Sequence, residues 1–393
     1  MTTQTQAPMA QRSLQKIHFT HKDMDYYLSW ILGREVLDGS DRQECMTTVT
    51  KIKDGDPKSW HQAWVELAVE TEARARDALE RGEKEEARKA FLRACTYFRE
   101  PLFMADPKAT TFKECVDKQQ ACFRAAMPLF PFSIEVVEME YQGKKAQGYS
   151  WRGEEKGQGF PTILIVGGME TFAEDCYFIT GQLAVERGFN LIAIDLPGQG
   201  MNPGQGLFLE ADMKPPVGAL ISFALSRPEV DPQRLALFGF SWGGHIVLQG
   251  AESEPRLKAL VANPPMPDVF KAAAAQQSGN GRSDPVNVLV FEQLAWRFGL
   301  QISAIGPRLV KAYQYLVHGK ANCKKIACPT LCMAGEGEAK ITLDLAKKCF
   351  SQMPNPQNKL VILTAEEGGE AHCQVNNLPL LNKVILDWLE TVI

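Results

Sequence analysis

Six short apolar runs, each bounded by turn residues, constrain the fold of this chain more than any other feature of its sequence. Helix-length stretches separate most of them. Continuous apolar runs are typical of strands that are buried on both faces of a parallel sheet. Their alternation with helices predicts an α/β fold with a mostly parallel, doubly wound sheet, whose ligand site lies beyond the carboxyl ends of the strands. The runs are at residues 162–166, 191–194, 235–238, 259–261, 330–333 and 360–363.

The chain before these runs has two other patterns. Directly ahead of them, residues 134–141 and 144–151 have the pattern of two strands joined by a tight turn at Gln142-Gly143. Further upstream, apolar residues recur at the helical period, which predicts amphipathic helices. These helical stretches are at residues 64–79, 87–98 and 112–126.

The patterns together predict the domain organisation. We expect a helical domain over residues 1–131 and a sheet domain over residues 132–393. A long insertion between two of the strands, at about residues 264–320, contains a helical stretch at 286–298. Because such an insertion lies at the strand ends, where the ligand site is expected, it predicts a helical lid.

The composition excludes several classes of function. Hydrophobic residues make up 45% of the chain and charged residues 23%, as in ordinary globular proteins. The formal net charge of -4 is too small to favour nucleic acid or an anionic membrane as a partner. No apolar run approaches the roughly 20 residues of a membrane span, and the first residues lack the apolar core of a secretory signal. We therefore expect a cytoplasmic protein that acts on a small molecule.

The ten cysteines are scattered, and none forms a Cys-x-x-Cys pair. Cys328 and Cys332 fall in or beside an apolar run, where a free thiol behaves as a small hydrophobic side chain. The spacing therefore predicts free thiols in a reducing compartment rather than disulfides or a metal site. We expect no metal and no cofactor.

The residues Gly239-Phe240-Ser241-Trp242-Gly243 match the pattern Gly-x-Ser-x-Gly of a nucleophile elbow. In an elbow the serine occupies a sharp, strained turn between a strand and a helix, which exposes its hydroxyl. The context fits, because a predicted strand precedes the motif and a helix can begin directly after it. The motif therefore predicts that Ser241 is a nucleophile.

A serine hydroxyl is a weak nucleophile and needs an adjacent base. His372 lies in a loop after the last predicted strand, which is where the chain order serine, acid, histidine puts the base. His245 follows Ser241 by four residues on the same helix, so we expect it to point into the core. His318 falls in the lid stretch, where a surface role is the simpler interpretation. The remaining histidines precede the sheet: His18, His21 and His61.

The third member of such a triad should follow the strand predicted at residues 330–333, and three acids do so. We favour Glu338, which lies three residues past the first glycine of the turn, and leave Glu336 and Asp344 as alternatives.

Acyl chemistry also needs backbone amides that stabilise the oxyanion formed at the reacting carbonyl. The amide of Trp242 follows the nucleophile, and that of Met169 lies in a loop after a predicted strand. Gly168 and Glu170 of that loop are candidate substrate contacts. Asp195, at the start of another loop, is expected to tie its own loop down rather than to react.

Four segments resemble one branch of the α/β hydrolases. They are VGGMETFAEDCYF, IDLPGQG, GFSWGG and EEGGEAHCQVNNLP. The branch has a helical domain before the hydrolase fold and includes dihydroxypseudooxynicotine hydrolase and the fungal yellowish-green pigment hydrolases, which shorten polyketides. The helical stretch GEKEEARKAFLRACTYFRE resembles it too, so the likeness covers nearly the whole chain.

The resemblance implies an α/β-hydrolase fold, a triad of Ser241, His372 and Glu338, and a homodimer whose helical domain and lid cover the active site. Asp268 would be a pocket acid in the lid, or a structural residue there. The implied reaction is hydrolysis of a polyketide-like or other secondary-metabolite carbonyl compound, by carbon–carbon (retro-Claisen) or ester cleavage. An acyltransferase or cyclase could use the same triad. A non-catalytic binding protein is disfavoured because both Ser241 and His372 are present.

Overall fold

The computed structural model describes residues 12–153, 159–269, 271–272, 284–300 and 319–393. It divides into two compact units. One comprises Pro131–Ala272 and Ala295–Ile393, and the other comprises Met1–Phe130 and Ala273–Leu294. The three candidate catalytic residues Ser241, His372 and Glu338 belong to the first unit, as do all the strands among the described residues; it is called the sheet unit below, and the second is called the helical unit.

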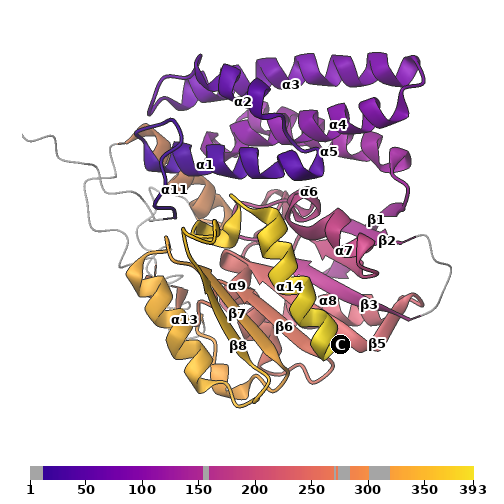
Figure 1. The fold of residues 1–393 in the computed structure, drawn as a ribbon, viewed down its shortest axis with the longest axis vertical. Helices are drawn as coiled ribbons and strands as arrows, with labels where there is room; N and C mark the ends of the chain where they lie inside the picture. Colours follow the sequence, from indigo (N-terminus) through magenta and orange to yellow (C-terminus); the bar gives the residue numbers. More distant parts are fainter. Residues whose placement is uncertain (1–11, 154–158, 270, 273–283, 301–318) are drawn as a thin grey trace, which may run out of the picture. The chain divides into compact units, whose positions relative to one another are not determined.

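The sheet unit is built on an eight-stranded sheet in the order β1-β2-β4-β3-β5-β6-β7-β8 (Figure 1). Each observed strand overlaps one of the eight predicted stretches, so the predicted mostly parallel α/β fold is confirmed. The strands are β1 (Ser133–Tyr141), β2 (Lys144–Arg152), β3 (Phe160–Val166), β4 (Asn190–Ile194), β5 (Val230–Phe240), β6 (Ala259–Asn263), β7 (Thr330–Gly335) and β8 (Lys359–Leu363).

The pairing directions decide where the strand ends meet. β1 and β2 form an antiparallel hairpin, and β2 is also antiparallel to β4. From β4 to β8 every neighbouring pair is parallel. The carboxyl ends of these six strands therefore lie along one edge of the sheet, and loops that follow them can converge there.

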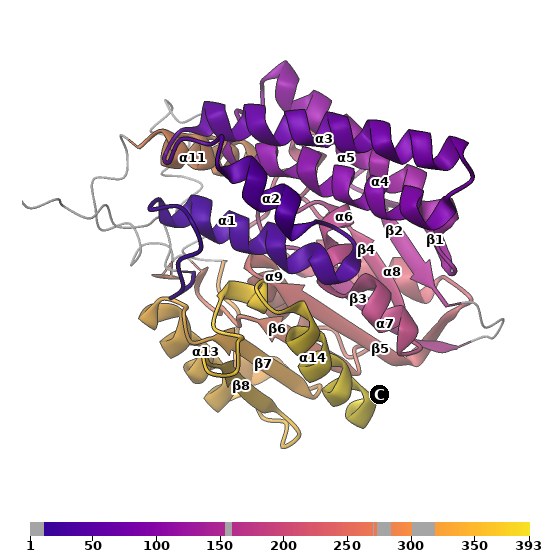
Figure 2. The same cartoon turned by 45° about the horizontal axis from the view of Figure 1, so that its top comes forward.

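Helices cover both faces of the sheet. Figure 1 shows α14 on the near side of the sheet and α8 and α9 on the far side, and Figure 2 shows the same layers from a second angle. Apolar strands stay buried in this arrangement, and β4, β6 and β7 have no exposed residue. The helices of this unit are α6 (Ala173–Cys176), α7 (Gln182–Glu186), α8 (Lys214–Leu225), α9 (Trp242–Ala251), α13 (Lys340–Gln352) and α14 (Leu378–Val392).

The three helical patterns predicted upstream of the sheet correspond to α3 (Pro57–Glu80), α4 (Lys84–Arg99) and α5 (Thr110–Ala126). α3 begins where it does because the carboxylate of Asp56 accepts a hydrogen bond from the Lys58 amide and Pro57 fits the first helical position. Two further helices, α1 (Lys22–Gly33) and α2 (Arg42–Val49), were not predicted individually.

The helical unit also includes most of α11 (Pro285–Arg297), up to Leu294. The carboxylate of Asp284 accepts a hydrogen bond from the Val286 amide at 2.9 Å and lies 3.3 Å from Nε2 of His21. Nε2 of Gln293 donates to the carbonyls of Leu102 and Ala105. Residues at both ends of α11 thus form polar contacts with residues far away in the sequence.

The lid predicted at about residues 264–320 is described only in part, because 270, 273–283 and 301–318, including His318, lie outside the described residues. Its first and last described segments meet at an isolated bridge between Asp268 and Lys320. Among all described helices, none combines the length and the apolar composition needed to cross a membrane.

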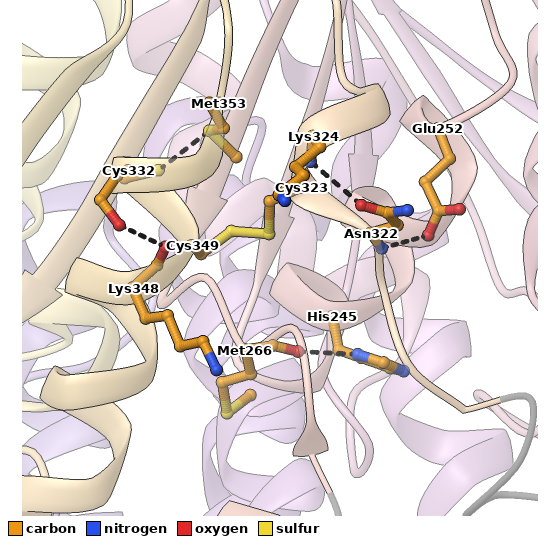
Figure 3. Close-up of a disulfide and its surroundings, with 11 residues drawn as sticks. His245, Glu252, Met266, Asn322, Cys323, Lys324, Cys332, Lys348, Cys349 and Met353 are labelled. Carbon is orange, nitrogen blue, oxygen red and sulfur yellow. Dashed lines mark hydrogen bonds between the residues drawn. A yellow bond between two sulfur atoms is a disulfide. The ribbon is translucent and has the colours of Figure 1, made fainter.

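The prediction that the cysteines are free is wrong for one pair. Cys323 and Cys349 form a disulfide, which Figure 3 shows beside Cys332 and Met353. Their Cα atoms are 5.6 Å apart although 26 residues separate them in the sequence. The sequence did not reveal the pair because Cys323, on the 3-10 helix Cys323–Lys325, and Cys349, on α13, come together only after folding. Eight cysteines are free: Cys45, Cys95, Cys115, Cys122, Cys176, Cys328, Cys332 and Cys373.

Candidate active site

Ser241 forms a sharp turn between β5, which ends at Phe240, and α9, which begins at Trp242. Its backbone has φ 56° and ψ −128°, a strained conformation for a residue with a side chain. The turn also needs glycine beside it, because a Cβ atom at Gly239 would lie 2.2 Å from the carbonyl oxygen of Gly243. This is the geometry that the Gly-x-Ser-x-Gly pattern predicts.

The loop after β8 brings His372 to this turn. Nε2 of His372 is 2.9 Å from Oγ of Ser241, and Nδ1 is 2.5 Å from Oε1 of Glu338. The three side chains follow β5, β7 and β8, so all come from the carboxyl edge of the sheet. With Nδ1–H donating to the carboxylate, Nε2 carries the lone pair that can accept the serine proton.

The structure distinguishes the three acids that follow β7. Glu338 is 5% exposed and is the one that contacts His372. Oε1 of Glu336 instead accepts a hydrogen bond from the Ala365 amide at 2.6 Å. Asp344 lies on α13 and forms an exposed ion pair with Lys340. Glu338 alone of the three has the geometry of a triad acid.

The surroundings of His372 favour its cation. Burial alone would lower the pKa of the imidazole, but the neighbouring Cys373 sulfur and Glu338 carboxylate, by charge and hydrogen bonding, outweigh burial and raise that pKa to about 10. Of these groups, the carboxylate is the one that we regard as decisive, because it contacts Nδ1 directly. An imidazolium at this position is therefore stabilised.

The loop after β3 lies against Ser241. A Cβ atom added to Gly168 would be 2.8 Å from Cβ of Ser241 and 3.1 Å from its Oγ, so only glycine fits without a shift. Met169 follows in this loop, and Trp242 follows the serine. Within the described residues, neither of these two backbone amides donates a hydrogen bond to another loop or side chain. Both are thus available to an external oxygen.

The other candidate contacts have different surroundings. Glu170 is half-buried in the loop of Gly168. Oδ1 of Asp268 accepts a hydrogen bond from the Lys271 amide at 3.0 Å, and its Oδ2 lies 3.5 Å from Nζ of Lys320. These contacts join the ends of the lid stretch, and no hydrogen bond in the described structure connects Asp268 with Ser241 or His372.

His245 is buried, with Nδ1 2.7 Å from the carbonyl oxygen of Met266 (Figure 3). Burial lowers the pKa of its imidazole to about 4, so the ring is neutral near pH 7.

The pKa of the Asp195 carboxyl is raised well above its usual range, first by desolvation and then by the charge of Glu174. The backbone carbonyl of Asp195 accepts a hydrogen bond from Nδ2 of Asn202.

Two further residues of the site, Asn263 and Gln374, could not be identified from a sequence motif. The carbonyl of Asn263, at the end of β6, accepts a hydrogen bond from the Ser241 amide at 2.7 Å. The side chain of Asn263 donates to Oε1 of Gln374, two residues after His372. Isolated amide side chains are common throughout proteins, so no motif could have identified this pair.

A family model and several named relatives match this sequence. The family model of the FrsA-like esterases matches residues 3–334, a match that ends before Glu338 and His372. The 20-hydroxy-prefusarin hydrolase FUS2 of Gibberella moniliformis is 27% identical, over 92% of this chain and 94% of the relative. The hydrolase LUC6 of a Fusarium species is also 27% identical over the same shares.

Solved structures show the same fold. The crystal structure of 2,6-dihydroxy-pseudo-oxynicotine hydrolase superposes with a TM-score of 0.72, over 92% of this chain and 95% of that one, at 20% sequence identity. Wild-type AbyA5 superposes with a TM-score of 0.61 at 19% identity, over 92% of this chain and 99% of that one. Both the sequence match and the fold lead to one conclusion. The chain is an α/β hydrolase and belongs to the FrsA-like esterase family.

Proposed function

We propose that this enzyme is a serine hydrolase whose triad is Ser241, His372 and Glu338. The observation that carries the proposal is that His372 contacts both partners, through Nε2 to the serine Oγ and through Nδ1 to the carboxylate. A nucleophile, a base and a group that orients the base are the three parts that acyl chemistry needs.

In the proposed first half-reaction, Oγ of Ser241 attacks the carbonyl carbon of the substrate while Nε2 of His372 takes the hydroxyl proton. The amides of Trp242 and Met169 donate hydrogen bonds to the oxyanion of the tetrahedral intermediate. When the intermediate collapses, the bond to the leaving group breaks, and the imidazolium returns the proton to that group. Water, activated by His372, then attacks the acyl-serine and releases a carboxylic acid.

We propose a polyketide-like or other secondary-metabolite carbonyl compound as the substrate. The support is one relative that is named as a 20-hydroxy-prefusarin hydrolase and one structural neighbour that is named as 2,6-dihydroxy-pseudo-oxynicotine hydrolase. The triad could cleave an ester, where an alkoxide leaves, or a carbon–carbon bond, where an enolate leaves. An enolate is a competent leaving group only when a second carbonyl or a phenol stabilises it, so β-diketones are the carbon–carbon substrates to test.

A fluorophosphonate probe tests the nucleophile. It should label the purified wild-type protein covalently at Ser241, and Ser241→Ala should abolish both labelling and turnover without unfolding. Smaller side chains fit the turn, and glycine would relieve the strain at φ 56°, so Ser241→Gly should unfold at a higher temperature than Ser241→Ala. Turnover retained in Ser241→Ala would refute the proposal.

Turnover in heavy-oxygen water separates the reaction classes. Label in the released acid identifies hydrolysis, whereas an unlabelled ester or ring product identifies acyl transfer or cyclisation by the same triad. We also propose that the protein is a homodimer, as the resemblance implies, and sedimentation velocity of the full chain tests this.

A further inference from the structure

The turn at residues 194–200, which follows β4, has no role in the proposed triad, yet one of its side chains reaches the active-site loop. Gln199 is 2% exposed. Its Nε2 donates to the carbonyl oxygen of Gly167 at 2.6 Å and to that of Gly168 at 3.2 Å. Its Oε1 accepts a hydrogen bond from the Leu196 amide at 3.0 Å. Every polar atom of the amide has a partner, and the reversed orientation of the amide would lose all three bonds.

A second side chain contacts the same carbonyl. Oγ1 of Thr171 donates to the carbonyl oxygen of Gly168 at 3.0 Å, and Thr171 is 2% exposed. The two loops are also joined through the backbone, because the Gly200 amide donates to the carbonyl of Thr171 at 3.1 Å. The Gly168 carbonyl therefore accepts from two buried side chains, one on each loop.

The Gly168 carbonyl belongs to the same peptide unit as the Met169 amide. A peptide unit is planar, and in its trans form the C=O and N–H bonds point in opposite directions. Holding the carbonyl oxygen on one side therefore fixes the N–H on the other. Two hydrogen bonds to the oxygen also polarise the unit, which makes its N–H a stronger donor.

This peptide unit adjoins the nucleophile, since a Cβ atom at Gly168 would be 3.1 Å from Oγ of Ser241. We propose that Gln199 and Thr171 are positioning residues, which orient and polarise the Gly168–Met169 peptide so that the Met169 amide stabilises the oxyanion. The inference rests on the proposed serine mechanism. Both side chains act through the backbone carbonyl that they contact.

The size of the effect follows from what one oxyanion donor contributes. Removal of such a donor typically slows the chemical step by about 100- to 1,000-fold. When only one of the two side chains is changed, the other still donates to the Gly168 carbonyl, so the Met169 amide is present but less well oriented. We therefore expect kcat to fall roughly 10- to 100-fold with little change in KM.

The test compares matched variants of the full-length protein. Thr171→Val keeps the shape of the side chain and removes only the hydroxyl, while Thr171→Ser restores it. Gln199→Glu keeps the oxygen that accepts from Leu196 and removes the donor to both carbonyls. Thr162→Val is the control, because Thr162 is a buried threonine on β3 whose hydroxyl donates to the Phe160 carbonyl, away from the nucleophile.

Three readouts are measured for each variant: the rate of fluorophosphonate labelling, kcat and KM for an activated p-nitrophenyl ester, and inhibition by an alkyl boronic acid, which forms a tetrahedral serine adduct. Thr171→Val and Gln199→Glu should lose labelling rate, kcat and boronate affinity by similar factors at nearly constant KM. Thr171→Ser should recover all three. Circular dichroism and thermal unfolding establish that each variant is folded.

The inference is overturned if Thr171→Val labels within about threefold of the wild-type rate, a difference too small for a displaced oxyanion donor. It is also overturned if Thr162→Val loses as much, because the effect would then be a general loss of packing. A failure of the proposed function looks different: the wild-type protein itself would not label, or Ser241→Ala would remain active.

Discussion

Nδ2 of Asn263 donates a hydrogen bond to Oε1 of Gln374 at 2.8 Å, and both side chains are fully buried. Because the carbonyl of Asn263 also accepts from the Ser241 amide, one residue at the end of β6 holds both the nucleophile turn and the loop of His372. Cys373 and Gln374 both have left-handed backbone conformations, with φ of 58° and 51°. A strained loop persists only where its surroundings hold it, and this bond contributes to that restraint.

Gln374→Met should therefore weaken both stability and catalysis. The change keeps the length of the side chain but leaves the buried Nδ2 of Asn263 without its acceptor, which costs about 1–3 kcal/mol. Thermal unfolding should shift to lower temperature, and kcat should fall because His372 is less well placed. Gln352→Met, at the half-buried end of α13, is the matched control and should leave both unchanged. An unfolding temperature for Gln374→Met equal to that of wild type would contradict the argument.

The contacts of the three acids after β7 predict how much kcat/KM falls when each acid is replaced by its amide. Glu338→Gln should reduce kcat/KM by about 100- to 10,000-fold, since a neutral amide neither stabilises the imidazolium nor fixes its tautomer. Glu336→Gln and Asp344→Asn should each stay close to wild type, because these side chains bond to Ala365 and Lys340 instead. Steady-state rates on one ester decide the order. Greater damage from Asp344→Asn than from Glu338→Gln would show that the assignment is wrong.

The raised pKa of His372 predicts the pH dependence of the reaction. Only neutral imidazole can take the serine proton, so kcat/KM should increase as the pH rises through the pKa of His372. That pKa is raised from 6.5 to about 10, so the midpoint of the rise should lie on the alkaline side of 6.5. Glu338→Gln removes the charge that favours the cation and should move the midpoint to lower pH. Rates in overlapping buffers measure both, and a wild-type midpoint below 6.5 would count against this electrostatic account.

Gly168→Ala should inactivate the enzyme without unfolding it. The added Cβ would lie 2.8 Å from Cβ of Ser241, so the loop or the serine must move, and we expect a loss of kcat of about 100-fold. Gly218→Ala is the control, since no atom lies within 4 Å of the corresponding Cβ on α8. Alanine in a helix should even raise stability by about 0.5–1 kcal/mol. Comparable activity in the two variants would mean that the loop adapts to a side chain.

Removal of the helical domain should make the remaining protein poorly soluble. A protein truncated to residues 132–393 keeps α11 but loses the other members of the helical unit. α11, whose Val286 and Val290 are each at most 1% exposed in the full chain, would then lack the rest of its unit, and Gln293 would lose both its carbonyl partners. The soluble fraction after expression, and turnover of a large and a small ester, measure the effect. Full solubility with both activities intact would show that the helical domain is dispensable.

The sequence was most informative where chemistry or burial imposes a pattern. Six of the strands could be located because strands buried in a parallel sheet are continuous and apolar, and β1 and β2 because their two stretches flank the tight turn at Gln142-Gly143. Ser241 and His372 could be named as candidates because a nucleophile elbow requires glycines and the expected base follows the last strand. Glu338 could not be separated from its neighbours, since chain order does not give the direction of a side chain.

Other features depend on contacts that only the folded chain contains. The polar composition of α2 has little helical periodicity, so its packing rather than its pattern determines it. The disulfide joins cysteines with unremarkable spacing. Gln199, Asn263 and Gln374 act through single amide groups, and amides in loops usually have only local partners.

The membership of residues 284–294 in the helical unit also bears on how the chain is made. In most multidomain proteins the N-terminal domain can fold on the ribosome as soon as it has been synthesised. Here the helical unit lacks α11 until six of the eight strands have left the ribosome. A nascent chain arrested before residue 284 should therefore be digested readily by protease in its N-terminal helices, and one arrested well beyond Leu294 should resist.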